Sequence, residues 1–518
     1  MVHSTVTQLC FLITHVIFLK PHISAKVVEP SQKSFAWGPG LRPSSLVLPV
    51  RYFFIQAVDS AGQNLTGQSI PPPFQLTVQP RSGHCGIFSE LLDRKDGTYI
   101  ARFRVYESCR GLRLEVRLHN GQHIQGSPWL IEETVLHSNC DCPLTLDEWK
   151  EAASCPAAIP QIDRDVNQFS HEIPIDVTAH FHKLSATYHP QSASFCHYVM
   201  KSGQLYRKCF GEHVGFAIFM DTILLFLMRR AKLSDVNFIS NLGDYPLSSR
   251  AARGGSIKAP VFSWCGSMDS FDIVMPTYDI TESSLTGMDR VTLDMLSVQA
   301  TQTPIWPEKI PKAFWRGRDA RQERLYLVEI ARNHSDIMDA ALTNFFFFRD
   351  QEEQFGPKAP HVDFFQFFQY KYQINLDGTV AAYRFPYLLA GDGLIFKQES
   401  PYYEHFYPDL APWQHYIPVR RDLSDLVERI NWAREHDAEA WNISRSGAEF
   451  ARTNLLPHNV FCYYTLLLEK WTKFALPIRE VPRGYEVVQQ TEGPAVSCDC
   501  AAEMKDFVRP FGSSKNEL

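Results

Sequence analysis

The spacing of apolar residues changes once along the 518-residue chain, and this change limits the fold more than any other feature. Between residues 35 and 134, short apolar runs alternate with turn residues, and Tyr99 to Val105 alternates apolar with polar side chains. From about residue 181 to 480, strand-like and helix-like segments follow one another instead. The first pattern predicts a small antiparallel β-sandwich, and the second predicts a mostly parallel sheet covered by helices.

These patterns and the two ends divide the chain into five parts. They are a signal peptide over 1–25, a β-rich region over 26–134, a cysteine-containing linker over 135–180, an α/β region over 181–480 and a tail over 481–518.

Composition excludes two kinds of partner. The chain has 51 basic and 57 acidic residues, so it lacks the positive excess of nucleic-acid-binding proteins, and we expect no nucleic acid partner. The most apolar internal stretch, 214–228, is too short to cross a bilayer and contains Asp221. We therefore expect a buried helix there and no membrane insertion.

Both ends of the sequence carry patterns typical of targeting signals of the secretory pathway. Leu9 to Leu19 is a short apolar stretch, and the small residues Ser24 and Ala25 follow it, which predicts a signal peptide cleaved near Ala25. The alternative is a buried N-terminal strand. Lys515 to Leu518 reads Lys-Asn-Glu-Leu, a variant of the Lys-Asp-Glu-Leu retention signal. Together they predict a protein of the endoplasmic reticulum lumen that is retrieved by the KDEL receptor.

Cysteines and glycosylation motifs fit this compartment. The 12 cysteines include clusters over 140–155 and 498–500, and no nearby histidine completes a zinc site, so we expect disulfides. Cys10 would leave with the signal peptide, so at least one of the remaining cysteines stays unpaired. Glycosylation motifs begin at Asn64, Asn333 and Asn442.

A carboxylate follows one of the predicted strands directly. Residues 241–246 read Asn-Leu-Gly-Asp-Tyr-Pro and come after the apolar strand 236–240. A general base needs such a place, because it has to be fixed, partly desolvated and within reach of an acceptor hydroxyl. Asp244 is therefore the candidate base. The alternative is an aspartate that only stabilises a turn or caps a helix.

Arginines are concentrated where another predicted strand ends and a helix begins. Planar guanidinium groups and the backbone amides of a helix N-terminus both bind a diphosphate. The alternative is a solvated basic face paired with neighbouring acids. The residues are Arg316, Arg318, Arg321 and Arg324.

A second phosphate-binding pattern follows the predicted strand 372–376. Small residues after Gly378 permit close backbone approach at the start of a predicted helix over 380–389, and one arginine lies in its first turns. Glu404, in an aromatic segment, is a candidate acceptor for ribose hydroxyls, the alternative being a core segment. The pattern consists of Val380, Ala381, Ala382, Tyr383 and Arg384.

Two resemblances bring these motifs together. In the β-rich region, Gly38 to Leu41, Asp96 to Tyr99 and Gly126 to Trp129 stand in the order of a filamin-type immunoglobulin-like repeat. The remaining motifs, together with Phe262 to Ser267 and Pro412 to Val419, resemble the filamin-bearing, KDEL motif-containing branch of the protein O-glucosyltransferases, the Rumi-like enzymes of glycosyltransferase family 90. The resemblance covers nearly all of the chain after the signal peptide.

This resemblance implies an α/β GT-B-like glycosyltransferase with two Rossmann-like lobes, preceded by an all-β immunoglobulin-like filamin repeat. Such enzymes transfer glucose from UDP-glucose to a serine of folded EGF-like repeats, as in Notch and fibrillins, with inversion and without a metal ion or other cofactor. Asp244 matches the family's base, Arg324 and Arg384 match its nucleotide-sugar-binding arginines, and the segment 380–383 matches its diphosphate cradle.

Two positions depart from the Rumi-like pattern. Arg318 stands where those members have a small hydroxyl residue, so it is also a candidate contact to the nucleotide sugar, and Gly243 stands where they have an arginine. Two other functions stay open at this point. One is an O-xylosyltransferase that uses UDP-xylose, because one hydroxymethyl group discriminates only modestly. The other is a non-catalytic lumenal interaction protein with a filamin module.

Overall fold

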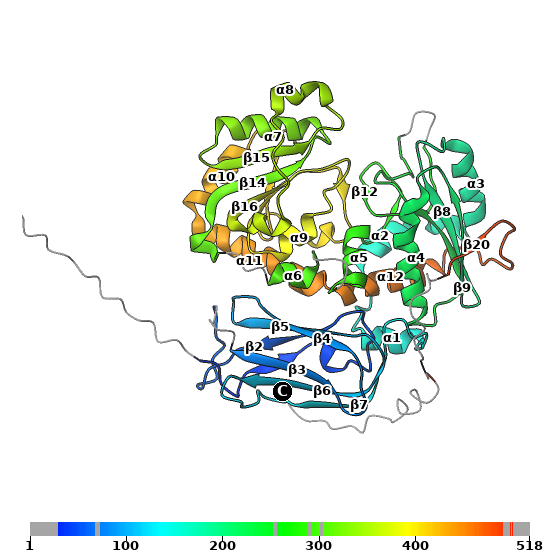
Figure 1. Cartoon of the computed structure of the whole chain (residues 1–518). Helices are drawn as coiled ribbons and strands as arrows, with labels where there is room; N and C mark the ends of the chain where they lie inside the picture. Colours follow the sequence, from blue (N-terminus) through cyan, green and yellow to red (C-terminus); the bar gives the residue numbers. More distant parts are fainter. Residues whose placement is uncertain are drawn as a thin grey trace, which may run out of the picture.

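The computed structural model describes residues 29–67, 73–251, 256–288, 293–300, 304–489, 498 and 500. The predicted signal peptide and the Lys-Asn-Glu-Leu end lie outside the described residues. Within them an all-β region precedes an α/β region, as the apolar spacing predicts (Figure 1).

Residues 29–67 and 73–135, here called the β-module, form a sandwich of two antiparallel sheets with strand orders β1-β2-β5-β4 and β3-β6-β7. Phe53, Phe103 and Leu114 are fully buried between the sheets. Their packing explains why the strands alternate apolar and polar side chains. The strands are β1 (Phe35–Trp37), β2 (Arg51–Gln56), β3 (Phe74–Pro80), β4 (Ile87–Asp93), β5 (Thr98–Val105), β6 (Cys109–Leu118) and β7 (Trp129–Val135).

Strand β2 is buried on both faces, because a second layer covers the outside of its sheet. Phe53 and Ile55 point into the sandwich. Tyr52 and Phe54 alternate with them along the strand and so point to the opposite face, where they belong to the same hydrophobic cluster as the α/β region. The β-module therefore shares a core with the rest of the chain, and Figure 1 shows it lying against α6 and α12.

Residues 135–180 are not the linker that the sequence indicates. They form α1 (Leu146–Ala152), α2 (Pro160–Asn167) and the start of α3 (Val177–Thr187). Trp149 and Ile162 are buried in the core of the α/β region. Helices of 7 and 8 residues make about two turns each, too few for a clear apolar period, so the sequence pattern hides them.

The first lobe of the α/β region is built on a six-stranded sheet of order β13-β11-β10-β8-β9-β20. Strands β10, β11 and β13 run parallel, and β8 is antiparallel to its neighbours. Helices α3, α4 (Ala217–Met228), α5 (Tyr278–Thr286) and α12 (Pro457–Trp471) pack with it in one core. The strands are β8 (Phe195–Lys201), β9 (Gln204–Phe210), β10 (Val236–Asn241), β11 (Val261–Ser263), β13 (Ile273–Val274) and β20 (Glu486–Val487).

The second lobe is built on a fully parallel five-stranded sheet of order β15-β14-β16-β17-β19 with its own core. The short pair β12 (Gly266–Ser267) and β18 (Tyr402–Tyr403) joins the lobes. The strands are β14 (Ile310–Arg318), β15 (Met338–Asn344), β16 (Tyr370–Asn375), β17 (Leu394–Gln398) and β19 (Ile417–Val419). The helices are α6 (Met295–Gln299), which follows α5, and α7 (Gln322–Asn333), α8 (Glu352–Phe355), α9 (Phe385–Ala390), α10 (Leu426–Glu435) and α11 (Asp437–Asn454).

Both cysteine clusters form disulfides, which confirms that expectation. The early cluster is joined to the late part of the chain, and Cys265 is a buried free thiol. Asn64, Asn333 and Asn442 are all exposed, as glycosylation requires. No helix in the described part of the chain is long and apolar enough to cross a membrane. The disulfides are Cys85–Cys109, Cys140–Cys498, Cys142–Cys500, Cys155–Cys462 and Cys196–Cys209.

Candidate active site

A cavity of about 860 Å³ is lined by residues of both lobes. Its walls lie just past the carboxyl ends of β10, β14 and β16, the position at which parallel sheets bind ligands. Its volume is in the range of cavities that enclose a small molecule. The cavity brings together eight of the nine residues predicted from the sequence, namely Asp244, Arg318, Arg324, Val380, Ala381, Ala382, Tyr383 and Arg384.

The turn that carries Asp244 is fixed by a neighbouring side chain. At the end of β10, the Asn241 side-chain amide donates to the Tyr245 carbonyl oxygen at 2.7 Å, and its oxygen accepts from the Gly243 amide at 2.9 Å. These bonds satisfy backbone groups that the strand no longer pairs. Asp244 is therefore held at the cavity edge by the asparagine that ends the strand.

The Asp244 carboxyl group is half-buried, and no hydrogen bond from the described residues reaches it. Burial raises its pKa above the usual carboxyl range, and the positive charge of Arg318 partly opposes this shift. A carboxylate with a raised pKa and no partner accepts a proton more readily than a solvated one.

A second carboxyl group, Asp279, lines the same cavity and was not predicted from the sequence. Burial raises its pKa to about 6, and the negative charges of Glu282 and Asp244 add to the effect. Asp279 is the second residue of α5, where acidic residues commonly stabilise the helix dipole. Because acidic residues are common at this helix position, the sequence alone does not mark Asp279 as a functional residue.

Arg324 is buried in α7 and donates to three backbone carbonyl oxygens. Its guanidinium group reaches Asp377 at 2.6 Å, Arg318 at 3.0 Å and Leu376 at 3.2 Å. Burial and the neighbouring cation of Arg384 lower its pKa to about 9, so it is charged at neutral pH. Carbonyl oxygens fix the guanidinium group without cancelling its charge, which leaves that charge for an anion in the cavity.

Arg384 and Arg318 add to this positive wall. Arg384 donates to the Arg316 carbonyl oxygen at 2.6 Å, and burial followed by the charge of Arg318 lowers its pKa to about 10. Arg318 is exposed at the end of β14, with its guanidinium group 5.4 Å from the centre of the Phe346 ring. The structure therefore gathers three arginines that the sequence singled out.

The segment 380–383 is not the start of a helix. Helix α9 begins at Phe385, with Arg384 as its N-cap residue, so Val380 to Tyr383 form a loop. The helix starts late because Pro386 lies in its first turn, where proline needs no hydrogen-bond acceptor, whereas the same ring disfavours helix farther upstream. The small residues still line the cavity, but a helix dipole across 380–383 does not contribute.

Glu404 is the one predicted residue that the structure does not bring to the cavity. It is fully buried, and its carboxyl oxygens lie beside Tyr407 without a hydrogen bond of good geometry. Burial raises its pKa well above the usual range, which favours the protonated form of the carboxyl group. The prediction that Glu404 accepts ribose hydroxyls is therefore not supported by its position, and an aromatic core segment is the better description.

Aromatic side chains form the outer edge of the cavity. Phe346 and Phe347 line it although they are 45% and 64% exposed, which is unusual for phenylalanine. The buried carboxylate of Asp319 holds this loop, accepting from the backbone amides of Phe346, Phe347 and Phe348 at 2.7 to 2.8 Å. An exposed apolar edge held this firmly is suited to contact with another molecule.

Among the described residues, no group of three or more His, Cys, Asp or Glu side chains is arranged to hold a metal ion. The charged groups that line the cavity are instead the two aspartates on the first lobe and the arginines on the second. This arrangement places proton-accepting groups opposite anion-binding groups across one cavity.

Comparison with known proteins agrees with this chemistry. The filamin/ABP280 repeat model matches residues 28–130, and the glycosyl transferase family 90 model matches residues 150–512. The chain is 48% identical to Protein O-glucosyltransferase 2 of Danio rerio over 473 residues, which cover 91% of this chain and 93% of that protein. It is 43% identical to Protein O-glucosyltransferase 3 of Homo sapiens over 480 residues, covering 92% and 94%.

A more distant match is restricted to part of the chain. Protein O-glucosyltransferase 1 of Homo sapiens is 31% identical over 253 residues, covering 47% of this chain and 64% of that protein. The family model spans most of the α/β region, and the first relatives are matched over nearly their whole length. The chain is therefore a glycosyltransferase that belongs to glycosyl transferase family 90 and carries an N-terminal filamin repeat.

Proposed function

We propose that the protein transfers glucose from UDP-glucose to a serine hydroxyl of folded EGF-like repeats, such as those of Notch and fibrillins, in the lumen of the endoplasmic reticulum. The observation that carries the proposal is the cavity in which Asp244 and Asp279 of the first lobe face Arg318, Arg324 and Arg384 of the second. The family match and the names of the relatives support protein O-glucosylation.

In this proposal Asp244 removes the proton from the acceptor serine. The serine oxygen attacks the anomeric carbon of glucose as the bond from that carbon to the UDP oxygen breaks, so the configuration at the carbon inverts. The carboxylate carries the proton away, and the bonding electrons leave with UDP. The raised pKa of Asp244 suits this step, because proton transfer is most effective when the pKa of the base lies near the working pH.

The arginines stabilise the leaving group. Negative charge grows on the diphosphate as the glycosidic bond breaks, and fixed positive charges nearby lower the energy of that state. The charges of Arg324 and Arg384 are available because their guanidinium groups donate to carbonyl oxygens rather than to carboxylates. We propose that these charges act in place of a metal ion, and that the two lobes form a GT-B-like pair.

The acceptor enters at the aromatic edge. A folded repeat presents its serine from outside, so its surface meets Phe346 and Phe347 at the rim of the cavity. Exposed glycosylation motifs and five disulfides suit an oxidising compartment, and the retention motif at 515–518 would be read by the KDEL receptor.

The test is transfer to a folded EGF-like repeat by purified protein, with UDP-glucose and UDP-xylose compared in buffer containing a chelator. We expect a repeat whose mass increases by one hexose with UDP-glucose, and almost no product from the Asp244→Asn variant. Loss of activity on adding chelator would refute the metal-independent mechanism. Transfer of xylose alone would establish the xylosyltransferase instead, and no transfer of either sugar would leave a binding protein.

A further inference from the structure

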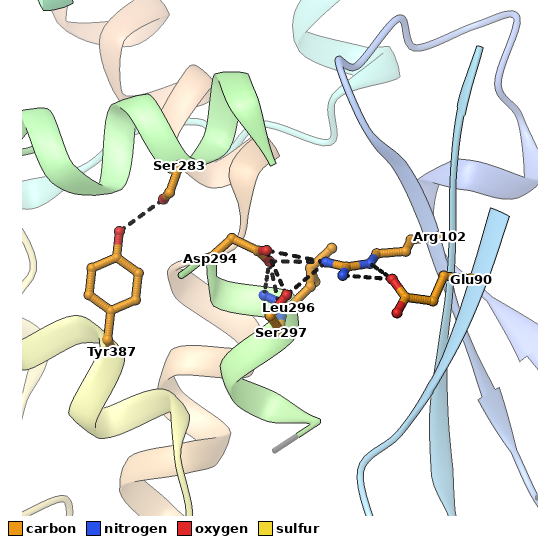
Figure 2. A network of polar contacts seen from close by, with 7 residues as sticks. All are labelled: Glu90, Arg102, Ser283, Asp294, Leu296, Ser297 and Tyr387. Atoms are coloured by element: carbon orange, nitrogen blue, oxygen red, sulfur yellow. Dashed lines mark hydrogen bonds and ion pairs between the residues drawn. The ribbon is translucent and has the colours of Figure 1, made fainter. Parts of the chain in front are cut away.

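A buried arginine of the β-module binds an aspartate that lies next in sequence to a residue of the cavity wall. Arg102 in β5 lies against the N-terminal end of α6, where its guanidinium group donates to the Asp294 carboxylate at 3.2 and 3.3 Å and to the Ser297 hydroxyl at 3.0 Å (Figure 2). The side chains of Arg102 and Asp294 are each only 8% exposed. On its other side Arg102 binds Glu90 of β4 at 2.8 Å.

Asp294 does two things at once. As the N-cap residue of α6, its carboxylate accepts from the backbone amides of Leu296 and Ser297, both at 2.9 Å. The same carboxylate binds Arg102. Leu293, the residue before Asp294, lines the cavity. A displacement of Asp294 therefore moves a residue of the cavity wall.

A second route leads from Arg102 to the cavity. Arg102 and Ser283 of α5 both line one small void of about 10 Å³. The Ser283 hydroxyl oxygen accepts from the Tyr387 hydroxyl at 2.9 Å, and that hydroxyl lies 3.1 Å from the Asp279 carbonyl oxygen. Tyr387 and Asp279 both line the cavity.

A spacer role for the β-module does not account for these contacts. A flexibly attached domain keeps a polar interface, whereas this one buries an ion pair and contributes Tyr52 and Phe54 to the transferase core. Buried ion pairs add little net stability compared with apolar residues, but removing one partner leaves an uncompensated charge. Such a pair is well suited to fixing the register of two surfaces.

We propose that Arg102 of the β-module is a positioning residue for the transferase, which holds Leu293 and the start of α5 in the arrangement that binds the nucleotide sugar. The proposal rests on the proposed function, because it assigns the cavity to UDP-glucose. It gives the filamin repeat an indirect part in binding the nucleotide sugar, in addition to any role as a spacer.

The test compares two ion pairs that join the β-module to the α/β region. In the Arg102→Gln variant we expect the KM for UDP-glucose to rise about tenfold, with a smaller change in kcat, because the cavity wall is displaced while Asp244 and the arginines are kept. The matched control is Asp96→Asn, which removes the negative charge from the 2.5 Å ion pair between Asp96 and Arg452 of α11. Neither control residue lines the cavity, so its KM should stay at the wild-type value.

Two further variants separate positioning from folding. Arg102→Lys keeps the charge with fewer donors, and we expect a KM between those of wild type and Arg102→Gln. Adding Asp294→Asn to Arg102→Gln removes the unpaired charge while asparagine still caps α6, so KM should fall back towards wild type. If the Arg102→Gln protein does not fold, as shown by circular dichroism, the Lys variant and the double variant carry the test.

The outcomes distinguish this inference from the proposed function. A wild-type KM in folded Arg102 variants, or an equal rise in the Asp96→Asn control, overturns the positioning role while leaving the transferase intact. If the wild-type protein transfers no glucose, the proposed function fails first. UDP-glucose binding measured by calorimetry in the same proteins should change in step with KM.

Discussion

The two lobes line the same cavity with side chains of opposite charge, aspartates on the first and arginines on the second. On the second lobe, Arg324 and Arg384 are held by backbone carbonyl oxygens at fixed distances. On the first lobe, Asp244 and Asp279 have raised pKa values, and no hydrogen bond from the described residues reaches either carboxyl group. The arginines are thus held in place by the protein's own backbone, whereas the two carboxyl groups have no such partner among the described residues.

Removing the base should have the largest effect. The Asp244→Asn variant keeps the shape of the turn but loses the group that accepts a proton, so we expect kcat to fall by about 10²- to 10⁴-fold. Transfer to a folded repeat measures the loss, and calorimetry with UDP should show unchanged binding.

Asp279→Asn serves as the control on the same lobe. Because Asp279 is not assigned the proton, its replacement should retain far more activity than Asp244→Asn. Equal losses in the two variants would mean that the base has been assigned to the wrong carboxylate.

The second lobe should respond differently. In Arg384→Gln we expect kcat to fall by about 10²- to 10³-fold, because in the proposed mechanism its charge stabilises the leaving diphosphate in the transition state. Unlike the Asp244 variant, this protein should also bind UDP more weakly. A loss of kcat with unchanged UDP affinity would argue against a diphosphate contact.

The positive charge of Arg318 on the second lobe should also affect the pH dependence of activity through the pKa of Asp244 on the first lobe. Only the ionised form of Asp244 accepts a proton, so kcat/KM should rise with pH through its raised pKa. Arg318 lowers that pKa, so Arg318→Gln should move the acid limb to higher pH, whereas Arg318→Lys should leave it nearly in place. Asp279, which lines the same cavity, has a pKa of about 6, and Asp279→Asn removes its contribution to the pH profile. An acid limb that does not move in Arg318→Gln would contradict the electrostatic link.

Glu404→Gln should have the smallest effect. Burial favours the protonated form of this carboxyl group, which does not line the cavity, so an amide of the same shape should change the KM for UDP-glucose by less than about threefold. A large increase in KM would restore the ribose contact suggested by the sequence.

The sequence predicts the parts of the site that depend on single strands. An apolar strand followed by a carboxylate gives Asp244 at the end of β10, and an arginine cluster after a strand gives Arg318 and Arg324 around β14 and α7. These positions are predictable because parallel strands place their carboxyl ends at one edge.

The parts that depend on tertiary packing are not predictable in the same way. Glu404 is buried in the core and Asp279 lines the cavity because of how distant segments pack together, and no local sequence pattern indicates either position. The helices of 135–180 form because Trp149 and Ile162 fit a core contributed by distant segments. The late start of α9 follows from Pro386, a local signal that the run of small residues obscures.

The carbonyl-bound arginines have a consequence for turnover. UDP has a free terminal phosphate and carries about one more negative charge at neutral pH than UDP-glucose does. In the proposed reaction, a cavity whose positive charge is permanent should therefore hold the spent nucleotide more strongly than the donor. We expect competitive inhibition by UDP that weakens as ionic strength rises, with departure of the nucleotide limiting the rate in dilute buffer.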